Sequence, residues 1–473
     1  MKRSGRVART ALAVVTVLLA GVALNGHSAE PTEELTVLGP WTDDEEVAFR
    51  AVLEKFRKSS GIHARYQGHR DVSQVLQVAI ERDRPPDVAV LPRVNDLQRY
   101  VNAGRLVPLE GPITTDPGAA PQLVKLAPKV GEVRDKLPYA VSVTTHLKSV
   151  VWYAPTELKR FGQSAPSTWD ELVGLTQRRI GAEQVRWCLG MSAQSVSGWP
   201  GTDWIEDILL HRSGEDSYEK WTRGDLHWNS PEVKGAWETW GALLGVSSEQ
   251  TARASLYTTF QTAAKGLFPR EVEKGDGEKV VIPPRCHLDH QGSFVVRKYP
   301  RKPSTPTNAD PPFTFFSTPP IGPKATQSLH EVSDDVAVMF RHTRDSKDVK
   351  DSDNTERARE LMSYLASEQA QTAWREPTEG VAFSRRGDAP EPQDRVLAAV
   401  AEQLRTGTLC WDASDLMPAA MATAFERAIL VYLEAPERLD SLLAELEKLR
   451  DKGPKAEWLD LTCVSPRERG PER

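Results

Sequence analysis

Residues suited to ligand contact gather in one short segment, GWPGTDW, in which Trp199, Asp203 and Trp204 stand among two glycines and a proline. The segment is predicted to be a loop that leads into a helix. Flat indole rings offer large, rigid contact area, and a carboxylate accepts hydrogen bonds from hydroxyl donors. A tryptophan in so tight a loop favours ligand contact over core packing alone. Asp203 has an alternative role, because an aspartate at the start of a helix can cap it.

Trp41 and Arg93 are two further candidates, because each follows a predicted strand. Strands are expected at 35–39, 62–66 and 87–91, with helices after each of them. This β-α-β-α-β order predicts a parallel sheet with helices on both faces, and such sheets bind ligands beyond the carboxyl ends of their strands. The loops that carry Trp41 and Arg93 occupy that place. Trp41 is equally consistent with packing under its loop, and Arg93 with a solvated surface charge.

The rest of the chain continues this alternation. Residues 139–153 are rich in β-branched residues, 334–340 (DDVAVMF) form a buried strand, and 357–370 and 419–450 are helical. Residues 187–240 hold seven of the 13 tryptophans. Trp221, Trp237 and Trp240 fall on amphipathic helical patterns and are expected in the core, and Trp152 is expected to pack at a hinge.

Sequence motifs of catalysis and nucleotide binding are missing. We find no G-x-S-x-G, H-E-x-x-H or Walker A pattern, and no G-x-G-x-x-G after a strand. No catalytic residue and no cofactor are therefore predicted, although a carboxylate pair for glycoside hydrolysis stays open. His287 and His290 follow Cys286, but the spacing matches no zinc pattern, so no metal site is predicted.

The N-terminus has the three-part layout of a secretory signal. Residues 1–9 are basic, 10–24 are an apolar run of 15 residues, and 25–29 end in small residues. The run is shorter than the roughly 20 residues that span a bilayer, and an uncleaved anchor is the alternative. Cleavage removes four positive charges and changes the formal net charge from -6 to -10.

An exported chain with an even number of cysteines favours disulfides. The four cysteines allow three pairings, and their order along the chain favours Cys188 with Cys286 and Cys410 with Cys463. Buried free thiols are the alternative. The acidic net charge argues against nucleic acid or anionic lipid as the main partner. A basic stretch at 297–303 (RKYPRKP) is either a docking patch or a solvated loop.

Longer segments carry a family pattern, in order, over nearly the whole mature chain. The most telling are 197–221 (SGWPGTDWIEDILLHRSGEDSYEKW) and 286–296 (CHLDHQGSFVV), joined by LTVLGPWTDDEEVAFRAVLEKFRKSSGI, PPDVAVLPRVNDLQRYVNAGRLVPL, VVWYAPTELKRFG, APSTWDELVGLTQ, DDVAVMF, LMSYLASEQAQTAW and WDASDLMP. Together they resemble the extracellular solute-binding proteins of bacterial ABC importers, carbohydrate type (family 1). The two most telling segments resemble the branch that binds α-glucosides.

The resemblance implies an α/β, two-lobed periplasmic-binding-protein-like fold (type II). Each lobe would be a mixed, mostly parallel sheet flanked by helices, with the ligand cleft at the hinge. Residues 1–29 would be the signal, 30–142 plus 335–375 lobe I, and 143–334 plus 376–473 lobe II, with crossings near 140–144, 332–336 and 380–384. A monomer at the outer face of the cytoplasmic membrane would then deliver its ligand to permease transmembrane subunits, without catalysis.

The implied ligand is a carbohydrate such as an α-glucoside or another small oligosaccharide. A pyranose has an apolar face of C–H groups, which aromatic rings cover, and a rim of hydroxyls, which polar side chains bind. The implied ligand residues are Trp41, Arg93, Trp199, Asp203, Trp204, Gln291, Ser293, Glu379, Trp411 and Asp412. For Gln291 and Ser293 the alternative is a hydrogen bond that satisfies the backbone, and for Glu379 it is exposure to solvent. Asp415 is expected to be a helix cap.

Two other functions stay open on the sequence. One is a secreted carbohydrate-active enzyme that uses the same tryptophan-rich surface with a carboxylate pair. The other is a binding protein for a non-sugar solute such as a peptide, a polyamine or a metal complex. The absence of catalytic motifs and the full-length family pattern favour the importer component over both.

Overall fold

The computed structural model describes residues 34–116, 122–127, 136–177, 179–180, 183–245, 250–275, 277–299, 311–322, 328–342, 349–375 and 394–466. Within these residues, no helix has both the length and the apolar character needed to span a membrane. The helices and strands of the N-terminal part are β1 (Leu35–Gly39), α1 (Asp44–Ser60), β2 (Ala64–Gly68), α2 (Val72–Glu81), β3 (Val88–Leu91), α3 (Leu97–Asn102), α4 (Pro112–Thr115), β4 (Leu123–Leu126), β5 (Leu137–Leu147) and β6 (Val150–Tyr153).

The elements that follow are mostly helical. They are α5 (Pro155–Arg160), α6 (Trp169–Gln177), β7 (Arg179–Ile180), β8 (Glu183–Gln184), α7 (Trp199–Ser213), α8 (Glu215–Thr222), α9 (Pro231–Leu244), α10 (Gln250–Ser255), α11 (Phe260–Ala264), β9 (Arg270–Glu273), β10 (Lys279–Ile282), β11 (Asp289–His290) and β12 (Thr314–Ser317). The C-terminal part contains β13 (Leu329–Met339), α12 (Val349–Leu365), α13 (Glu368–Arg375), α14 (Arg395–Thr406), β14 (Thr408–Trp411), α15 (Ala413–Leu416), α16 (Ala419–Glu434) and α17 (Leu439–Lys452).

The largest sheet begins with the predicted β-α-β-α-β unit. Strand β1 pairs in parallel with β2 on one side and with β3 on the other. The first connecting helix, α1, ends at Gly61, which adopts the left-handed conformation with φ 77°. A glycine adopts this conformation without the steric cost that a side chain would add. The predicted parallel sheet is therefore confirmed for these three strands.

Strand β13 is the central strand of this sheet, whose order is β2-β1-β3-β13-β5-β4 with β14 also paired to β13. It runs antiparallel to β3 and β5 and parallel to β14. All 11 of its residues are buried. Val336 lies opposite Leu91 of β3, so the predicted strand DDVAVMF does return to the first sheet.

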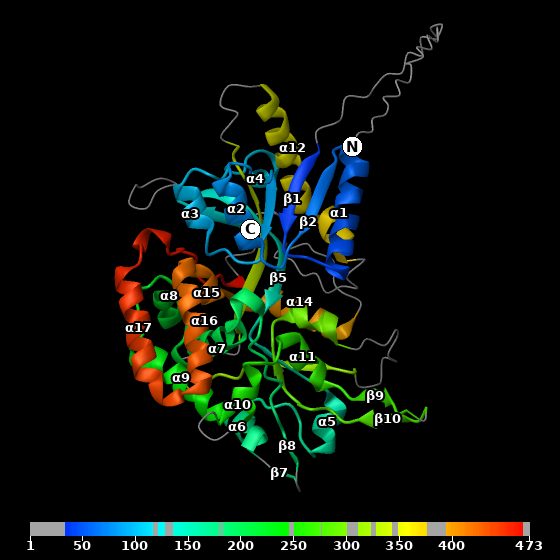
Figure 1. Cartoon of the computed structure of the whole chain (residues 1–473), viewed down its shortest axis with the longest axis vertical. Coiled ribbons are helices and arrows are strands. Elements are labelled where there is room, and N and C mark those ends of the chain that lie inside the picture. Colours follow the sequence, from blue (N-terminus) through cyan, green and yellow to red (C-terminus); the bar gives the residue numbers. More distant parts are fainter. Residues whose placement is uncertain are drawn as a thin grey trace, which may run out of the picture. The chain divides into compact units, whose positions relative to one another are not determined.

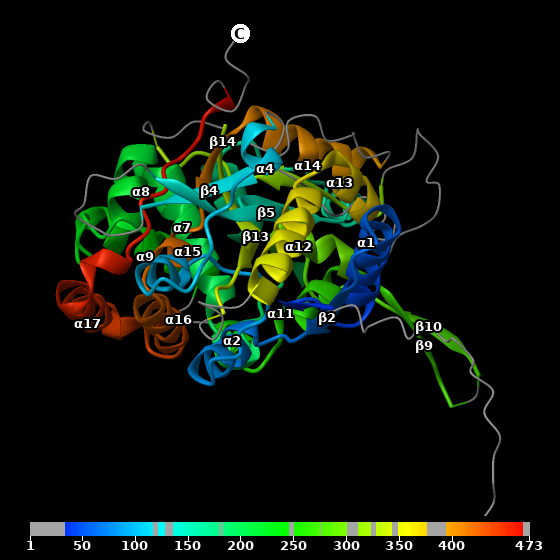
Figure 2. The ribbon, with the colours of Figure 1, turned by 90° about the horizontal axis from the view of Figure 1, so that it is seen from above.

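Helices cover both faces of the large sheet. On one face α1, α12 and α13 form a core that contains Phe49, Leu361 and Trp374, and Figure 2 shows α12 crossing beside β13. On the other face Leu76 and Leu97, from α2 and α3, belong to a second core. The prediction of a single helix over 357–370 is wrong, because α12 ends at Leu365 and a separate helix, α13, begins at Glu368. Ser367 caps α13 there, accepting a bond from the backbone N of Ala370 at 3.1 Å.

Helices α7, α9, α16 and α17 pack on one another to form a helical core, and they lie together in Figure 1. Trp221, Trp237 and Trp240 are fully buried in it, as predicted. The predicted C-terminal helix divides into α16 and α17 at Pro436, since proline has no backbone N–H to continue the helical hydrogen bonding.

A small sheet of order β11-β6-β12 packs on this helical core, to which Val151 of β6 belongs. Trp152 on β6 is fully buried, and its Nε1 donates to the backbone O of Gln291 at 2.8 Å. The predicted packing role of Trp152 is therefore confirmed. Strand β6 follows β5 after only two residues, Lys148 and Ser149, so the large and the small sheet are joined by a very short connection.

Candidate functional site

Helix α7 carries an unusual set of buried ionisable side chains. Asp203, Glu206, Asp207 and His211 are spaced three, four and eight residues along the helix, and all are buried. This spacing brings the side chains to one side of the helix. Burying a charge costs free energy unless the charge is paired and hydrogen-bonded, so each of these groups needs partners from other elements.

The partner of Asp203 is Lys148, in the short connection between β5 and β6. The Nζ atom of Lys148 donates to Asp203 Oδ2 at 2.9 Å and to Asp412 Oδ2 at 2.7 Å. All three side chains are buried. The ammonium also lies 5.3 Å from the ring centroid of Trp199, within the range of a cation–π interaction. One buried cation thus joins two carboxylates and one aromatic ring.

More carboxyl groups surround this ion pair than there are cations. Burial raises the pKa of Asp203 to about 6, although Lys148 opposes the shift. Burial also raises the pKa values of Glu206 and Glu331 well above the usual range. Burial alone would raise the pKa of Asp412 too, but Lys148 and neighbouring hydrogen bonds lower it. Burial therefore favours the protonated forms of Glu206 and Glu331, and a protonated carboxyl can donate a hydrogen bond as well as accept one.

Asp203, Glu331 and Asp412 place oxygen atoms within 4.8 Å of one another, as metal ligands do. The Lys148 ammonium already bonds two of these carboxylates, those of Asp203 and Asp412. His290 is directed elsewhere, with its Nε2 atom 2.9 Å from Asp207 Oδ2. Two of the three carboxylates are therefore paired with a cation of the protein itself.

An aromatic patch adjoins the ion pair. Trp199 is only partly buried, and its ring centroid lies 4.9 Å from that of Phe260 and 5.8 Å from that of Phe294. The ring of His146 stands edge-on to Phe294 at 5.5 Å, and its Nε2 atom lies 3.2 Å from Asp335 Oδ2. Aromatic faces and carboxylates thus alternate over a short distance, an arrangement that suits a ligand with apolar faces and hydroxyl groups.

Comparison with known proteins identifies the type of molecule. Residues 40–269 match the family model described as bacterial extracellular solute-binding protein. The chain is 28% identical over 406 residues to the alpha-glucosides-binding periplasmic protein AglE of Rhizobium meliloti, covering 83% of this chain and 81% of that protein. It is 28% identical over 415 residues to the osmoprotective compounds-binding protein GgtB of Synechocystis sp., covering 87% and 90%. The match over residues 40–269 and the two relatives thus make the chain similar to bacterial extracellular solute-binding proteins.

Solved structures of solute-binding proteins share the fold. The solute receptor AcbH aligns with a TM-score of 0.68 at 18% identity, over 88% of this chain and 98% of AcbH. The solute-binding protein RafE in complex with raffinose aligns with a TM-score of 0.62 at 14% identity, over 88% and 99%. The two-lobed α/β fold expected from the sequence is therefore confirmed. The family consists of extracellular binding proteins that serve sugar ABC transporters, rather than of enzymes.

The segment GWPGTDW is helical rather than a loop, which corrects the prediction. Helix α7 begins at Trp199 after Gly198, whose φ is 108°. A Cβ atom at Gly198 would lie 2.2 Å from the carbonyl O of Glu426, so this close approach requires glycine. Pro200 is tolerated in the first turn, where its missing N–H has no partner in any case. Asp203 lies one turn further on and does not cap the helix.

Three of the predicted tryptophans pack inside the protein. Trp41 is 3% exposed, with its ring 4.4 Å from that of Trp374 and 4.7 Å from that of Phe49. Trp204 is 2% exposed and stacks on His290 at 3.9 Å. Trp411 is 7% exposed and belongs to the core beside the large sheet. These contacts favour the packing alternative for Trp41 and the same role for the other two.

The predicted polar residues fall into two groups. Asp412 joins the site through Lys148, and its Oδ1 also accepts from the backbone N of Asp415 at 3.1 Å. Asp412 is therefore the cap of α15, and the expectation that Asp415 is the cap is wrong. Ser293 Oγ accepts from the backbone N of Leu147 at 3.1 Å, which is the backbone-satisfying alternative. Gln291 is buried, and Glu379 lies outside the described residues.

Arg93 makes a polar contact between the large-sheet side and the helical side of the protein. Its Nη1 atom lies 2.6 Å from Glu426 Oε1 on α16. Burial alone would lower the pKa of Arg93, but Glu426 outweighs it and raises the pKa. Two further contacts join Arg297 to Glu45 of α1 at 2.5 Å and Ser195 to Asp71 at 2.9 Å. Arg297 is thus paired within the molecule, although it begins the basic stretch seen in the sequence.

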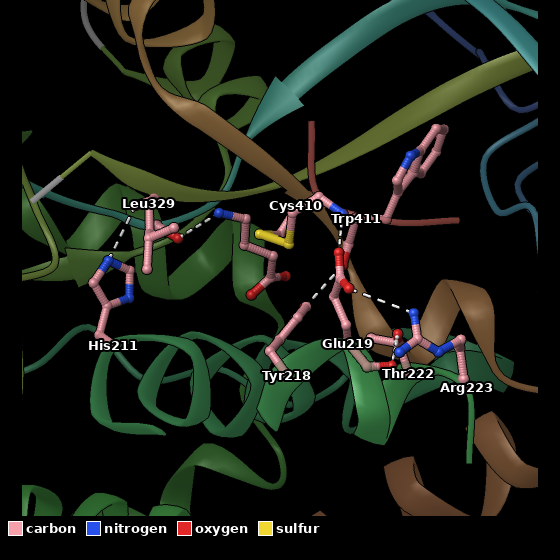
Figure 3. The surroundings of a disulfide bond; sticks show 11 residues. His211, Tyr218, Glu219, Thr222, Arg223, Leu329, Cys410 and Trp411 are labelled. Atoms are coloured by element: carbon pink, nitrogen blue, oxygen red, sulfur yellow. Dashed lines mark hydrogen bonds and ion pairs between the residues drawn. A yellow bond between two sulfur atoms is a disulfide. The ribbon is translucent and has the colours of Figure 1, made fainter. Parts of the chain in front are cut away.

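Both predicted disulfides are present, Cys188–Cys286 and Cys410–Cys463. Figure 3 shows the second of them, in which Cys410 lies at the end of β14 beside Trp411. Tyr218 Oη donates to the backbone O of Trp411 at 2.9 Å, and Glu219 accepts from the backbone N of Cys463 at 2.8 Å. The bridge and these bonds hold β14 against α8, directly before Asp412.

Sequence reasoning missed Lys148, Phe294 and His146. Lys148 had a visible signal, because it is a lone charge in the apolar, β-branched stretch 139–153, and such a charge needs a buried partner. Phe294 and His146 had no comparable signal, since only the tertiary fold brings β5 and the segment after β11 together.

Proposed function

We propose that this solute-binding protein captures an α-glucoside or another small oligosaccharide between its two lobes and delivers it to the transmembrane subunits of an ABC importer. The observation that carries the proposal is the likeness to AglE, whose name states that it binds α-glucosides, over 83% of this chain. That alignment includes both lobes as we expect them. The ligand that AglE is named for is thus the first candidate for the ligand class.

The aromatic patch supports a sugar. The partly exposed face of Trp199 offers a stacking surface for the C–H face of a pyranose, next to Phe294. Asp203 and Asp335 supply carboxylates for the hydroxyl rim, and His146 supplies a ring nitrogen. Asp203 Oδ1 is buried and has no hydrogen-bond partner among the described residues. An acceptor in that state gains most from a hydroxyl donor of a ligand.

The proposed lobes are 30–142 plus 335–375 and 143–334 plus 376–473. Contacts between them include Arg93–Glu426, Arg297–Glu45 and Ser195–Asp71. Contacts of this kind exist only when two lobes are close, so they would stabilise a closed form with ligand between the lobes. In this proposal Arg93 fastens the lobes, whereas Trp199, Asp203 and Asp412 lie at the ligand side.

The proposed location is the outer face of the cytoplasmic membrane. The basic, apolar and small-residue layout of residues 1–29 supports export, and two disulfides suit an oxidising compartment. The proposed working form is a monomer that docks on a permease. This combination agrees with the family, whose members are extracellular binding proteins of transporters.

A second candidate ligand class is an osmoprotective solute. GgtB, which is named for osmoprotective compounds, has the same identity to this chain and covers slightly more of it. A small osmolyte would occupy less of the aromatic patch than an oligosaccharide. Polar groups near Lys148, Asp203 and Asp412, which we call the polar centre, would then make most of the contacts.

A thermal-shift panel tests the proposal. Maltose, sucrose and trehalose are compared with neutral and zwitterionic osmolytes, amino acids and short peptides. A ligand present at about 100 times its Kd stabilises the folded protein by about 2.7 kcal/mol, which gives a clear rise in the unfolding temperature. We expect at least one glucoside to raise it and to remain chemically intact afterwards. A shift with an osmolyte alone would support the second candidate, and hydrolysis of the sugar would contradict both.

A further inference from the structure

Lys148 lies at the meeting point of three strand ends. It directly follows β5, and its backbone N donates to the carbonyl O of Glu331 on β13 at 2.8 Å. Its Nζ atom bonds Asp412, which directly follows β14 and whose own backbone N donates to Val332 O of β13 at 2.9 Å. One residue therefore fastens the ends of β5 and β14 to the central strand of the large sheet.

The same ammonium fixes the carboxylate of Asp203. It holds Oδ2 at 2.9 Å, while Oδ1 is buried and has no hydrogen-bond partner among the described residues. Because one oxygen is held, the carboxylate cannot rotate freely about its last bond, and the direction of Oδ1 is set. The Trp199 ring lies on the same ammonium at 5.3 Å. The orientation of an acceptor and of a stacking surface thus depends on one side chain.

We propose that Lys148 is a positioning residue that orients Asp203 toward the ligand and couples it to the strand ends of β5, β13 and β14. The inference rests on the proposed function, because it assigns a task to Lys148 within that binding site. Coupling of this kind lets a contact between ligand and Asp203 bias the strands that connect the two lobes. Lys148 itself makes no ligand contact in this account.

The charges around the ammonium determine what its loss would do. Without Lys148, Asp203 and Asp412 are two buried acids that face one another with no cation between them. Two such carboxyls repel when both are ionised, so one of them binds a proton at neutral pH. The titratable and charged groups that influence this centre are Asp203 and Glu206 of α7, Glu331 of β13, Asp412 and Asp415 at α15, Arg93 after β3 and His290 of β11.

Four variants test the proposal by calorimetric titration with maltose, sucrose and trehalose. Lys148→Met removes the cation, and Lys148→Arg keeps the charge. Lys148→Met combined with Asp412→Asn removes both charges of one ion pair. Lys265→Met is the matched control, since Lys265 is an exposed lysine outside the site. We expect Lys148→Met to raise Kd by about tenfold or more near pH 8. We also expect the double variant and Lys148→Arg to recover part of the loss, and Lys265→Met to match the wild type.

The pH profile separates positioning from mere structural support. In Lys148→Met the defect should shrink between about pH 8 and about pH 5.5, because a proton on one carboxyl replaces the missing cation. Equal affinity in Lys148→Met and wild type, or a defect of the same size at every pH, would overturn the proposal.

A ligand-free readout keeps this inference distinct from the proposed function. Carboxyl carbon NMR of labelled aspartates should show the Asp203 titration moving to higher pH in Lys148→Met. If wild type binds none of the three sugars, the proposed function fails, and the NMR titration still decides whether Lys148 controls Asp203. An unmoved Asp203 titration contradicts the inference even where sugar binds.

Discussion

The polar centre around Lys148 and the aromatic part of the helical core around Trp237, here called the aromatic core, are both buried. Different interactions offset the cost of burying them. Trp237 packs with its ring centroid 5.2 Å from that of Tyr432 and 5.8 Å from that of Phe425. Burial of such rings stabilises the fold without further help. Lys148 instead needs two carboxylates to offset the cost of its desolvation. The aromatic core therefore contributes to stability, whereas the polar centre calls for another reason, and we propose that this reason is ligand binding.

The largest expected effect is on the aromatic core. Trp237→Ala should lower the free energy of unfolding by about 3–5 kcal/mol, because it leaves a cavity among packed rings. Urea denaturation measures the loss, and Trp237→Phe is the milder control. The sugar Kd of the folded fraction should not change. A large loss of affinity with intact stability would contradict the division between the two regions.

The two disulfides provide the next comparison. Replacing either pair of cysteines by serine should cost about 2–5 kcal/mol of unfolding free energy. Only the loss of Cys410–Cys463 should also weaken ligand binding, because Cys410 lies two residues before Asp412. Denaturation and calorimetric titration of both double variants check this. Equal affinity in the two variants would show that the position of Asp412 does not depend on its neighbouring bridge.

Asp203→Asn should weaken sugar binding and leave the free energy of unfolding nearly unchanged, whereas Trp237→Ala should do the reverse. Burial raises the pKa of Asp203 to about 6, so its surroundings already disfavour the charged form. An amide of the same shape still accepts a bond from Lys148, and the stability should change by only about 1 kcal/mol. The sugar Kd should rise by about tenfold, since an acceptor of the ligand is weakened. Stability that falls as far as in Trp237→Ala would make Asp203 a structural residue.

The aromatic core was more predictable than the polar centre. Periodic apolar residues placed Trp221, Trp237 and Trp240 correctly, because helix packing follows local patterns. The pairing of Cys188 with Cys286 followed from chain order once export was assumed. Trp41 and Trp199 could not be separated in this way, since both follow short apolar or glycine-containing segments. Only the tertiary fold buries Trp41 against Trp374 and leaves Trp199 partly exposed.

The polar centre combines residues from elements far apart in the sequence. Lys148 and Asp412 are separated by 264 positions, and no local pattern links them. A lone lysine in an apolar stretch signals that a buried partner exists, but it does not identify the partner. The helical state of GWPGTDW was also beyond local rules, because Gly198 and Gly201 read as loop residues. Because these glycines have no side chain, the start of α7 packs closely against Glu426 and Ile429 of α16.

The smallest predicted effect is a pH dependence at the edge of the aromatic core. Glu447 accepts bonds from the backbone N of Trp228 at 2.8 Å and from Arg450. Burial alone would raise the pKa of Glu447, but these bonds lower it from 4.5 to about 2. A lowered pKa in the folded state stabilises the protein above pH 4.5 and loses this contribution as the pH falls toward 2. Urea denaturation over this range should show a shallower decline in Glu447→Gln, and an unchanged decline would rule out this role.

The central claim is that a sugar binds at the Trp199 side of the polar centre. Isothermal titration of maltose, sucrose and trehalose into wild type and into Trp199→Ala tests it most directly, with Trp237→Phe as a control for loss of an indole elsewhere. We predict binding of at least one sugar to wild type, a Kd raised by about tenfold in Trp199→Ala through the lost stacking, and no change in the control. No binding by wild type, or equal binding by Trp199→Ala, would contradict the account.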